Sequence, residues 1–150
     1  MRFSLAYEMQ RPMLDDHAVI EETIEQCILA DEMGFDAVWF VEHHFLTTFS
    51  GSPCPEVIFG ALSRLTKRIR LGFGVSVLPY HHPVRVAERV AMVDQLSHGR
   101  VEFGTGIGVA EHEFMRWNLP FFERQKMSSE ALEIIVKAWA QDGVTDDGQF

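Results

Sequence analysis

The 150-residue chain is long enough for about one domain that buries roughly two thirds of its surface. Hydrophobic residues make up 47% and charged residues 23%, which excludes a disordered chain. The net charge of −9 argues against a nucleic-acid or anionic-lipid partner. Cys27 and Cys54 are too few for a disulfide scaffold, and no apolar run approaches the roughly 20 residues of a membrane helix. We therefore expect a reduced, cytoplasmic protein without a membrane segment.

Four short runs rich in β-branched and aromatic residues predict strands. Their first residues lie 34, 33 and 31 positions apart, a spacing that fits one strand, one helix and two connections. The predicted strands are Arg2–Tyr7, Asp36–Val41, Ile69–Val77 and Arg100–Gly104.

Helical patterns with their own start and stop signals separate these strands. Capping acids, first-turn prolines and terminal glycines mark their ends. The predicted helices begin near Asp15 or Asp16, Pro55, Pro83 and Ser128, and end near Gly34, Leu65, Gly99 and Ala140.

Regular alternation of strand and helix predicts an α/β protein with a parallel sheet. In Ile69–Val77, bulky side chains alternate with Arg70, Gly72, Gly74 and Ser76, so one face is nearly bare and leaves room for a ligand or a close backbone approach. Two architectures fit, a doubly wound open sheet and a section of a (β/α)8 barrel, and periodicity alone does not separate them. In either one, function gathers at the C-terminal ends of the strands.

The segment Glu42-His43-His44-Phe45 follows the second predicted strand. On an extended segment His43 and His44 point in opposite directions, so at most one faces a given pocket. Histidine suits general acid/base work near neutral pH, and Glu42 could orient an imidazole. The alternative is a pair of histidines that are simply hydrogen-bonded in a loop.

Two further segments follow the third and fourth predicted strands. His81 and His82 are candidates for substrate contact, although His82 could simply be held extended before Pro83. The glycines of Gly104-Thr105-Gly106-Ile107-Gly108 would let backbone N–H groups approach a cofactor, but the dinucleotide fingerprint is missing and a plain turn is the alternative.

Two other features are expected to be structural. The paired histidines lack metal-ligand spacing and His112-Glu113 does not complete an HExxH motif, so we expect no metal site. Phe121 and Phe122 are expected to plug the end of the sheet or to cover a pocket.

Four ordered segments together resemble the bacterial luciferase-like flavin monooxygenases. They are Gly34-Phe35-Asp36-Ala37-Val38-Trp39, Glu42-His43-His44-Phe45, Val77-Leu78-Pro79 with His82-Pro83-Val84-Arg85, and Asp94-Gln95-Leu96-Ser97-His98-Gly99-Arg100. The resemblance covers nearly the whole chain, from about Met1 to Ala140. It implies a (β/α)8 TIM barrel of the luciferase-like type, of which this chain holds only about the first four βα units.

The resemblance also implies an activity. Such enzymes receive reduced FMN from a separate flavin reductase, react it with O2, and oxygenate an aldehyde-like substrate through a flavin C4a-peroxide. It implies a homo- or heterodimer as well. A non-catalytic partner subunit and an enzyme that uses the deazaflavin F420 are the alternatives.

Carried over by position, His43 is similar to the catalytic histidine of the family, with His44 beside it, and Glu42 to an acid near the flavin. Gly74-Val75 falls where a non-prolyl cis peptide often lies under the flavin ring, followed by Ser76. The nearly bare face of Ile69–Val77 would then lie under the flavin ring, which would explain why it carries so few side chains. Gly106 and Ile107 match the loop that lines the cofactor, although the luciferase catalytic subunit has Cys-Arg there, which argues against light emission.

The length departs most from the family. At roughly 33 residues per unit, eight units need about 264 residues, close to a usual barrel. We therefore interpret residues 1–150 as the N-terminal half of a barrel domain, with phosphate-anchoring residues beyond Phe150 and unpaired edges on the outer strands. We expect this half alone to aggregate, to dimerise edge to edge, or to fail to hold FMN.

Overall fold

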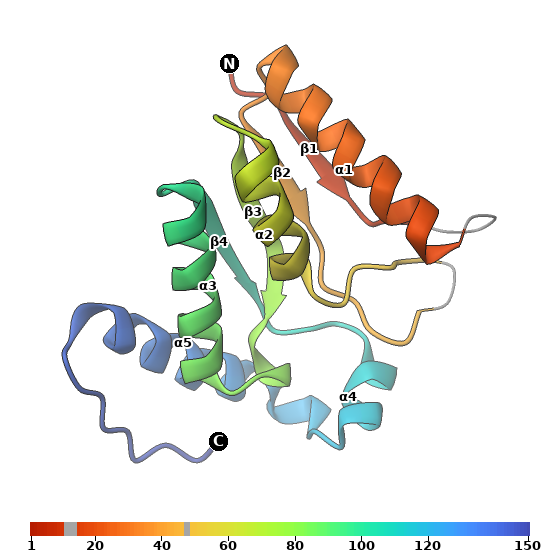
Figure 1. Ribbon diagram of the computed structural model, residues 1–150. Coiled ribbons are helices and arrows are strands. Elements are labelled where there is room, and N and C mark those ends of the chain that lie inside the picture. Colours follow the sequence, from red (N-terminus) through yellow and green to blue (C-terminus); the bar gives the residue numbers. More distant parts are fainter. Residues whose placement is uncertain (11–14, 47–48) are drawn as a thin grey trace. The chain divides into compact units, whose positions relative to one another are not determined.

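A computed structural model describes residues 1–10, 15–46 and 49–150. Within these ranges the chain forms four strands, five α-helices and two short 3-10 helices (Figure 1). The strands are β1 (Ser4–Tyr7), β2 (Ala37–Phe40), β3 (Arg70–Val77) and β4 (Val101–Gly106). The helices are α1 (Asp16–Met33), α2 (Pro55–Leu65), α3 (Pro83–Ser97), α4 (Glu111–Trp117) and α5 (Arg124–Ala140), with η1 (Leu78–Tyr80) and η2 (Phe121–Glu123).

The four strands form one parallel sheet in the order β1-β2-β3-β4, as the βα alternation predicts. The register places Tyr7 beside Phe40 and Trp39 beside Gly72. Each predicted strand overlaps an observed one, and most differences are one or two residues at the ends, where strand pairing begins or stops.

Local signals account for several helix ends. The Asp15 carboxylate accepts a hydrogen bond of 2.8 Å from the backbone N–H of Ala18, which caps α1. Gly34 ends the same helix with φ 85°, a left-handed conformation that glycine adopts without steric cost. The bounds of α2 are those that the sequence predicts. Helix α4, by contrast, lies in a stretch that the sequence pattern left as a connection.

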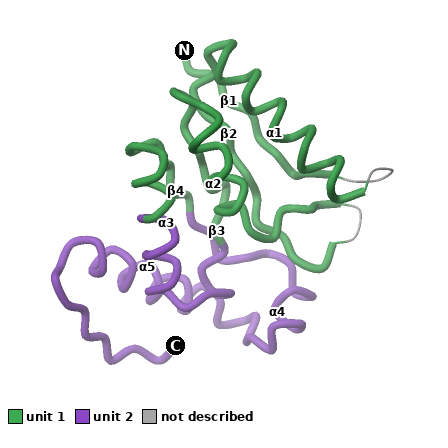
Figure 2. The backbone as a smooth tube through the Cα atoms, viewed as in Figure 1, with its two compact units in different colours: residues 1–76, 92–104 green, residues 77–91, 105–150 purple. Residues whose placement is uncertain are grey.

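Two compact units divide the chain (Figure 2). The first contains residues 1–76 and 92–104 and therefore most of the sheet, and the second contains residues 77–91 and 105–150. Helix α3 begins in the second unit and ends in the first.

The core of the first unit lies on the helix-covered side of the sheet. Phe59 of α2 packs edge-on against Phe40 at 5.3 Å and against Phe73 at 4.9 Å between ring centroids. Tyr7 stacks on Phe40 at 5.0 Å, and Phe103 meets Phe73 at 5.6 Å. Aromatic pairs at these distances contribute beyond the area that they bury. Successive side chains of a strand point to opposite faces, so Trp39, next to Phe40, lies on the other side of the sheet. We call this side the barrel-side face.

A buried carboxylate holds the connection between α2 and β3. Asp31 accepts backbone hydrogen bonds from Lys67 at 2.9 Å, Arg68 at 2.9 Å and Ile69 at 2.7 Å. Burial raises the pKa of Asp31, but these three N–H donors and the Arg68 guanidinium outweigh it, so the pKa lies below its usual value.

Arg100, which directly precedes β4, also stabilises the connection between α2 and β3. Its buried guanidinium donates to the backbone carbonyl oxygens of Ser63 at 2.9 Å and Ile69 at 3.0 Å, and to the hydroxyl of Thr66 at 2.8 Å. Burial lowers the pKa of Arg100, and the nearby charge of Asp31 raises it in part. Both residues therefore fix the start of β3, far along the strand from its C-terminal end.

The second unit is organised around an aromatic cluster. Tyr80 packs against Phe114 at 4.9 Å and Phe114 against Phe121 at 5.3 Å. The Arg124 guanidinium lies 4.0 Å above the Phe121 ring, and Phe122 is exposed. No helix among the described residues combines the length and apolarity that a membrane span requires.

Candidate functional site

The segment after β2 is held in place by hydrogen bonds at both of its ends. The Ser52 hydroxyl donates to the carbonyl oxygen of Val41 at 2.7 Å, and the His43 N–H donates to the carbonyl oxygen of Ser52 at 3.1 Å. The N–H of Gly51 donates to the carbonyl oxygen of Met9, at 3.0 Å, just beyond β1. The backbone around Glu42-His43-His44 is therefore fixed against the C-terminal end of the sheet.

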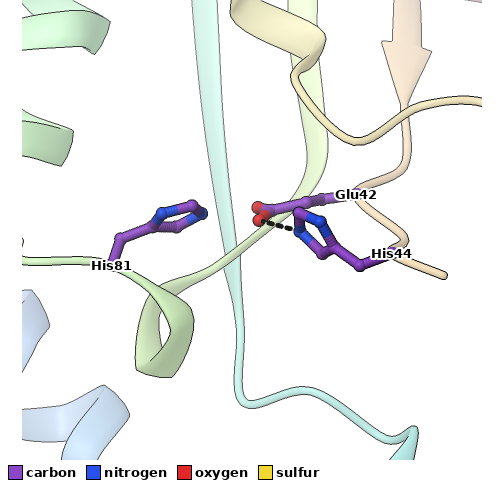
Figure 3. Close-up of side chains that lie close together, drawn as sticks. All are labelled: Glu42, His44 and His81. Atoms are coloured by element: carbon purple, nitrogen blue, oxygen red, sulfur yellow. Dashed lines mark hydrogen bonds and ion pairs between the residues drawn. The ribbon is translucent and has the colours of Figure 1, made fainter. Parts of the chain in front are cut away.

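Glu42 and His44 form a side-chain pair within this segment (Figure 3). His44 Nε2 lies 3.0 Å from Glu42 Oε1, and the two side chains are 10% and 3% exposed. Because residues two apart on an extended chain share a face, the spacing itself brings them together. The imidazole that is bonded to Glu42 is thus that of His44.

His43 has different surroundings. Its ring lies 6.0 Å from that of Phe49, in an edge-to-face arrangement at 72°. His43 and His44 are both partly buried, and neither lies in a helix or strand. The two adjacent histidines therefore differ in their contacts: His44 bonds to Glu42 and lies 6.1 Å from the Phe45 ring, whereas His43 lies beside Phe49.

The third strand carries the next group of predicted residues. The peptide bond between Gly74 and Val75 is cis, as the resemblance implies. Gly74 and Val75 are partly exposed, whereas Ser76 is 5% exposed.

The bare face of β3 is not empty. A Cβ atom added at Gly72 would lie 2.4 Å from Trp39 Cε3 and 2.5 Å from Cδ2. At Gly72 the missing side chain therefore makes room for the Trp39 indole, while a ligand role for the rest of this face stays a prediction.

Gly106 and Ile107 lie where β4 ends and the next loop begins. Gly106 is partly exposed and Ile107 is 38% exposed. Gly108 has φ 76°, and a Cβ atom there would lie 2.7 Å from the Phe114 ring. Gly108 thus permits the close approach of α4 to this loop, while a cofactor role for Gly106 and Ile107 stays a prediction.

His81 and His82 belong to the second unit. They line a cavity of about 520 Å³ together with apolar residues of η1 and α5, and His82 is exposed directly before α3. Substrate contact by either histidine also stays a prediction.

The sequence pattern contains Trp39 and Glu113 only within longer motifs and assigned neither of them a role at the site. Glu113 is 1% exposed and accepts a hydrogen bond of 2.7 Å from the Tyr80 hydroxyl. The alternating Gly72 and Gly74 were the signal that could have pointed to Trp39, because glycine inside a strand often marks a close approach. Nothing comparable in the sequence marked Glu113.

The family profile described as luciferase-like monooxygenase matches residues 1–150. The chain belongs to the luciferase-like monooxygenase family. The oxygenase component of a flavin-dependent trigonelline monooxygenase from Acinetobacter baylyi is 37% identical over 118 residues, which are 77% of this chain and 32% of that protein. The chain spans less than half the length of the curated relatives that it matches.

Solved structures share the fold. The monooxygenase RslO1 from Streptomyces bottropensis has a TM-score of 0.95 and 30% identity, and the match covers 100% of this chain and 46% of RslO1. The oxygenating constituent of 3,6-diketocamphane monooxygenase from Pseudomonas putida, in complex with FMN, has a TM-score of 0.93, 24% identity and coverage of 99% and 42%. The expected class, a luciferase-like (β/α)8 barrel represented by about four βα units, is confirmed.

Proposed function

We propose that this luciferase-like monooxygenase uses reduced FMN and O2 to oxygenate a small organic substrate of the aldehyde type. The observation that carries the proposal is the bond between the buried Glu42 and the partly buried His44, directly after β2 in a segment fixed by hydrogen bonds. In barrels of this kind the residues that follow the strands form the active site. The finer assignments below are part of the same proposal.

The barrel-side face of the first unit suits a planar ring system. Trp39 offers an aromatic surface there, and the partly exposed Gly74-Val75 backbone leaves no long side chain to obstruct an approach. Such apolar surfaces with few polar groups are typical of cofactor sites. We propose that Glu42, Gly74, Val75 and Ser76 contact the flavin. When bound, reduced flavin would supply the electrons that activate O2.

The Glu42–His44 bond determines which nitrogen of His44 can act as a base. With Glu42 ionised, and therefore an acceptor only, the proton of a neutral His44 would lie on Nε2, 3.0 Å from Glu42 Oε1. In that tautomer Nδ1 would be the basic nitrogen of His44, the one suited to proton transfer. We propose that His44 is positioned in this way and that His43 is the second proton-transfer residue.

The partners of the reaction belong to the proposal as well. One relative is named as an oxygenase component, which supports a separate reductase that delivers reduced flavin. A dimer remains a prediction. The alternatives are F420 as the cofactor and a partner subunit without catalysis, and the spectrum of the bound cofactor together with O2 consumption discriminates among the three.

Histidine variants of the natural full-length protein test the proposal. With reduced FMN and a panel of aldehydes, His43→Ala and His44→Ala are each expected to lower product formation by roughly 10²-fold, the usual contribution of acid/base catalysis. His17→Ala is the matched control because His17 is exposed on α1. Unchanged turnover in both site variants, with flavin binding intact, would contradict the assignment.

A further inference from the structure

Trp39 occupies a depression that the neighbouring strands leave for it. A Cβ atom added at Gly74 would lie 3.3 Å from Trp39 Cβ and 3.4 Å from Cε3, and one at Gly104 would lie 3.9 Å from Cζ3. At Gly72 the corresponding distances to the indole are 2.4, 2.5 and 2.9 Å. The ring therefore reaches from β2 across β3 towards β4, over positions that carry no side chain.

Within residues 1–150 the indole is not fully covered. Trp39 is partly exposed, in contrast to Phe40, the next residue, which is 0% exposed on the helix-covered side. Gly74 and Val75 are also partly exposed on the same stretch of sheet. An aromatic ring that packs against glycine positions offers a rigid apolar surface.

We infer that Trp39 is a flavin-binding residue. Its indole would contact the isoalloxazine ring on the barrel-side face and limit how closely that ring approaches the strands. This inference rests on the proposed function and adds a residue to it. Gly72 and Gly74 then serve the site indirectly, because a side chain at either position would crowd the indole. A purely structural Trp39 would pack against these glycines without meeting the cofactor.

Fluorine NMR separates the two roles without a substitution at Trp39. The natural full-length protein is labelled with 5-fluorotryptophan and titrated with FMN under equilibrium dialysis, which measures binding independently. The signals are assigned with Trp117→Phe and Trp139→Phe, and any further tryptophan is assigned in the same way. The Trp39 signal is expected to shift more than the others, because the flavin ring current acts on nearby nuclei.

Affinity gives the second readout. Loss of an aromatic contact is expected to weaken FMN binding in Trp39→Leu by roughly two- to tenfold. Trp117→Leu, at an exposed position of α4, should bind FMN like the parent. If FMN binds and the Trp39 signal does not move, the inference is wrong and the proposed function stands. If FMN does not bind at all, both are wrong.

Discussion

Gly72→Ala tests the packing of the barrel-side face. The added Cβ atom would meet Trp39 Cε3 at 2.4 Å, Cδ2 at 2.5 Å and Cζ3 at 2.9 Å, all far inside van der Waals contact. The atoms belong to one rigid ring rather than to the tip of a flexible chain, so the ring or the strand must shift. Overpacking of this kind costs about 1–3 kcal/mol of unfolding free energy.

Gly60→Ala is the matched control for this substitution. Gly60 lies inside α2, and a Cβ atom there would meet nothing within 4 Å. Alanine at a helical glycine is expected to stabilise by about 0.5–1 kcal/mol. The same chemical change should therefore have opposite signs at the two positions, as measured by urea unfolding of the natural full-length protein.

A double substitution identifies the cause of the Gly72 effect. If the clash with Trp39 is responsible, Gly72→Ala should cost clearly less in a Trp39→Leu background than in the parent, with a coupling of about 0.5–3 kcal/mol. The reasoning is refuted if Gly72→Ala leaves stability unchanged, or if its cost is the same in both backgrounds.

Two further predictions concern titratable groups of the first unit. Asp31→Asn should lower the unfolding free energy by about 1–3 kcal/mol, because it weakens the acceptor of three backbone N–H groups. Since the pKa of Asp31 is lowered in the folded state, its stabilisation is present above about pH 4 and is lost as the pH falls through the folded-state pKa. Urea unfolding across this range should show a smaller loss of stability in Asp31→Asn than in the parent, because only the other carboxyl groups still titrate there. Burial raises the pKa of Cys27 to about 11, against a partly opposing hydrogen bond with Tyr7, so iodoacetamide followed by mass spectrometry should find the exposed Cys54 alkylated and Cys27 spared in the native protein. Equal labelling of both cysteines would show that Cys27 is not buried as described.

The ends of helices were predicted well where capping residues, prolines or glycines mark them in the sequence. Pro55 and Leu65 bound α2 as expected, and Gly34 ends α1 because its positive φ needs a glycine. Helix α4 was missed because its seven residues make too short an apolar pattern to detect. The family assignment came from four motifs in order, and the comparisons confirm it.

The site was predicted less completely, because the packing between two strands depends on their register, which the sequence of one strand does not determine. The two-residue spacing of Glu42 and His44 allows them to pair, and the folded segment shows that His44, not His43, forms the hydrogen bond with Glu42. Similarly, the bare face of β3 was recognised, while the register that puts Trp39 beside Gly72 decides what fills it.

Isotope labelling tests the central claim, flavin-dependent oxygenation, most directly. The natural full-length protein is supplied with reduced FMN, an aldehyde substrate and ¹⁸O₂, and the organic product is analysed by mass spectrometry. The account predicts that one oxygen atom of the product derives from ¹⁸O₂ and that omission of FMN abolishes the product. A product without ¹⁸O, or one formed equally well with no flavin, would contradict the account.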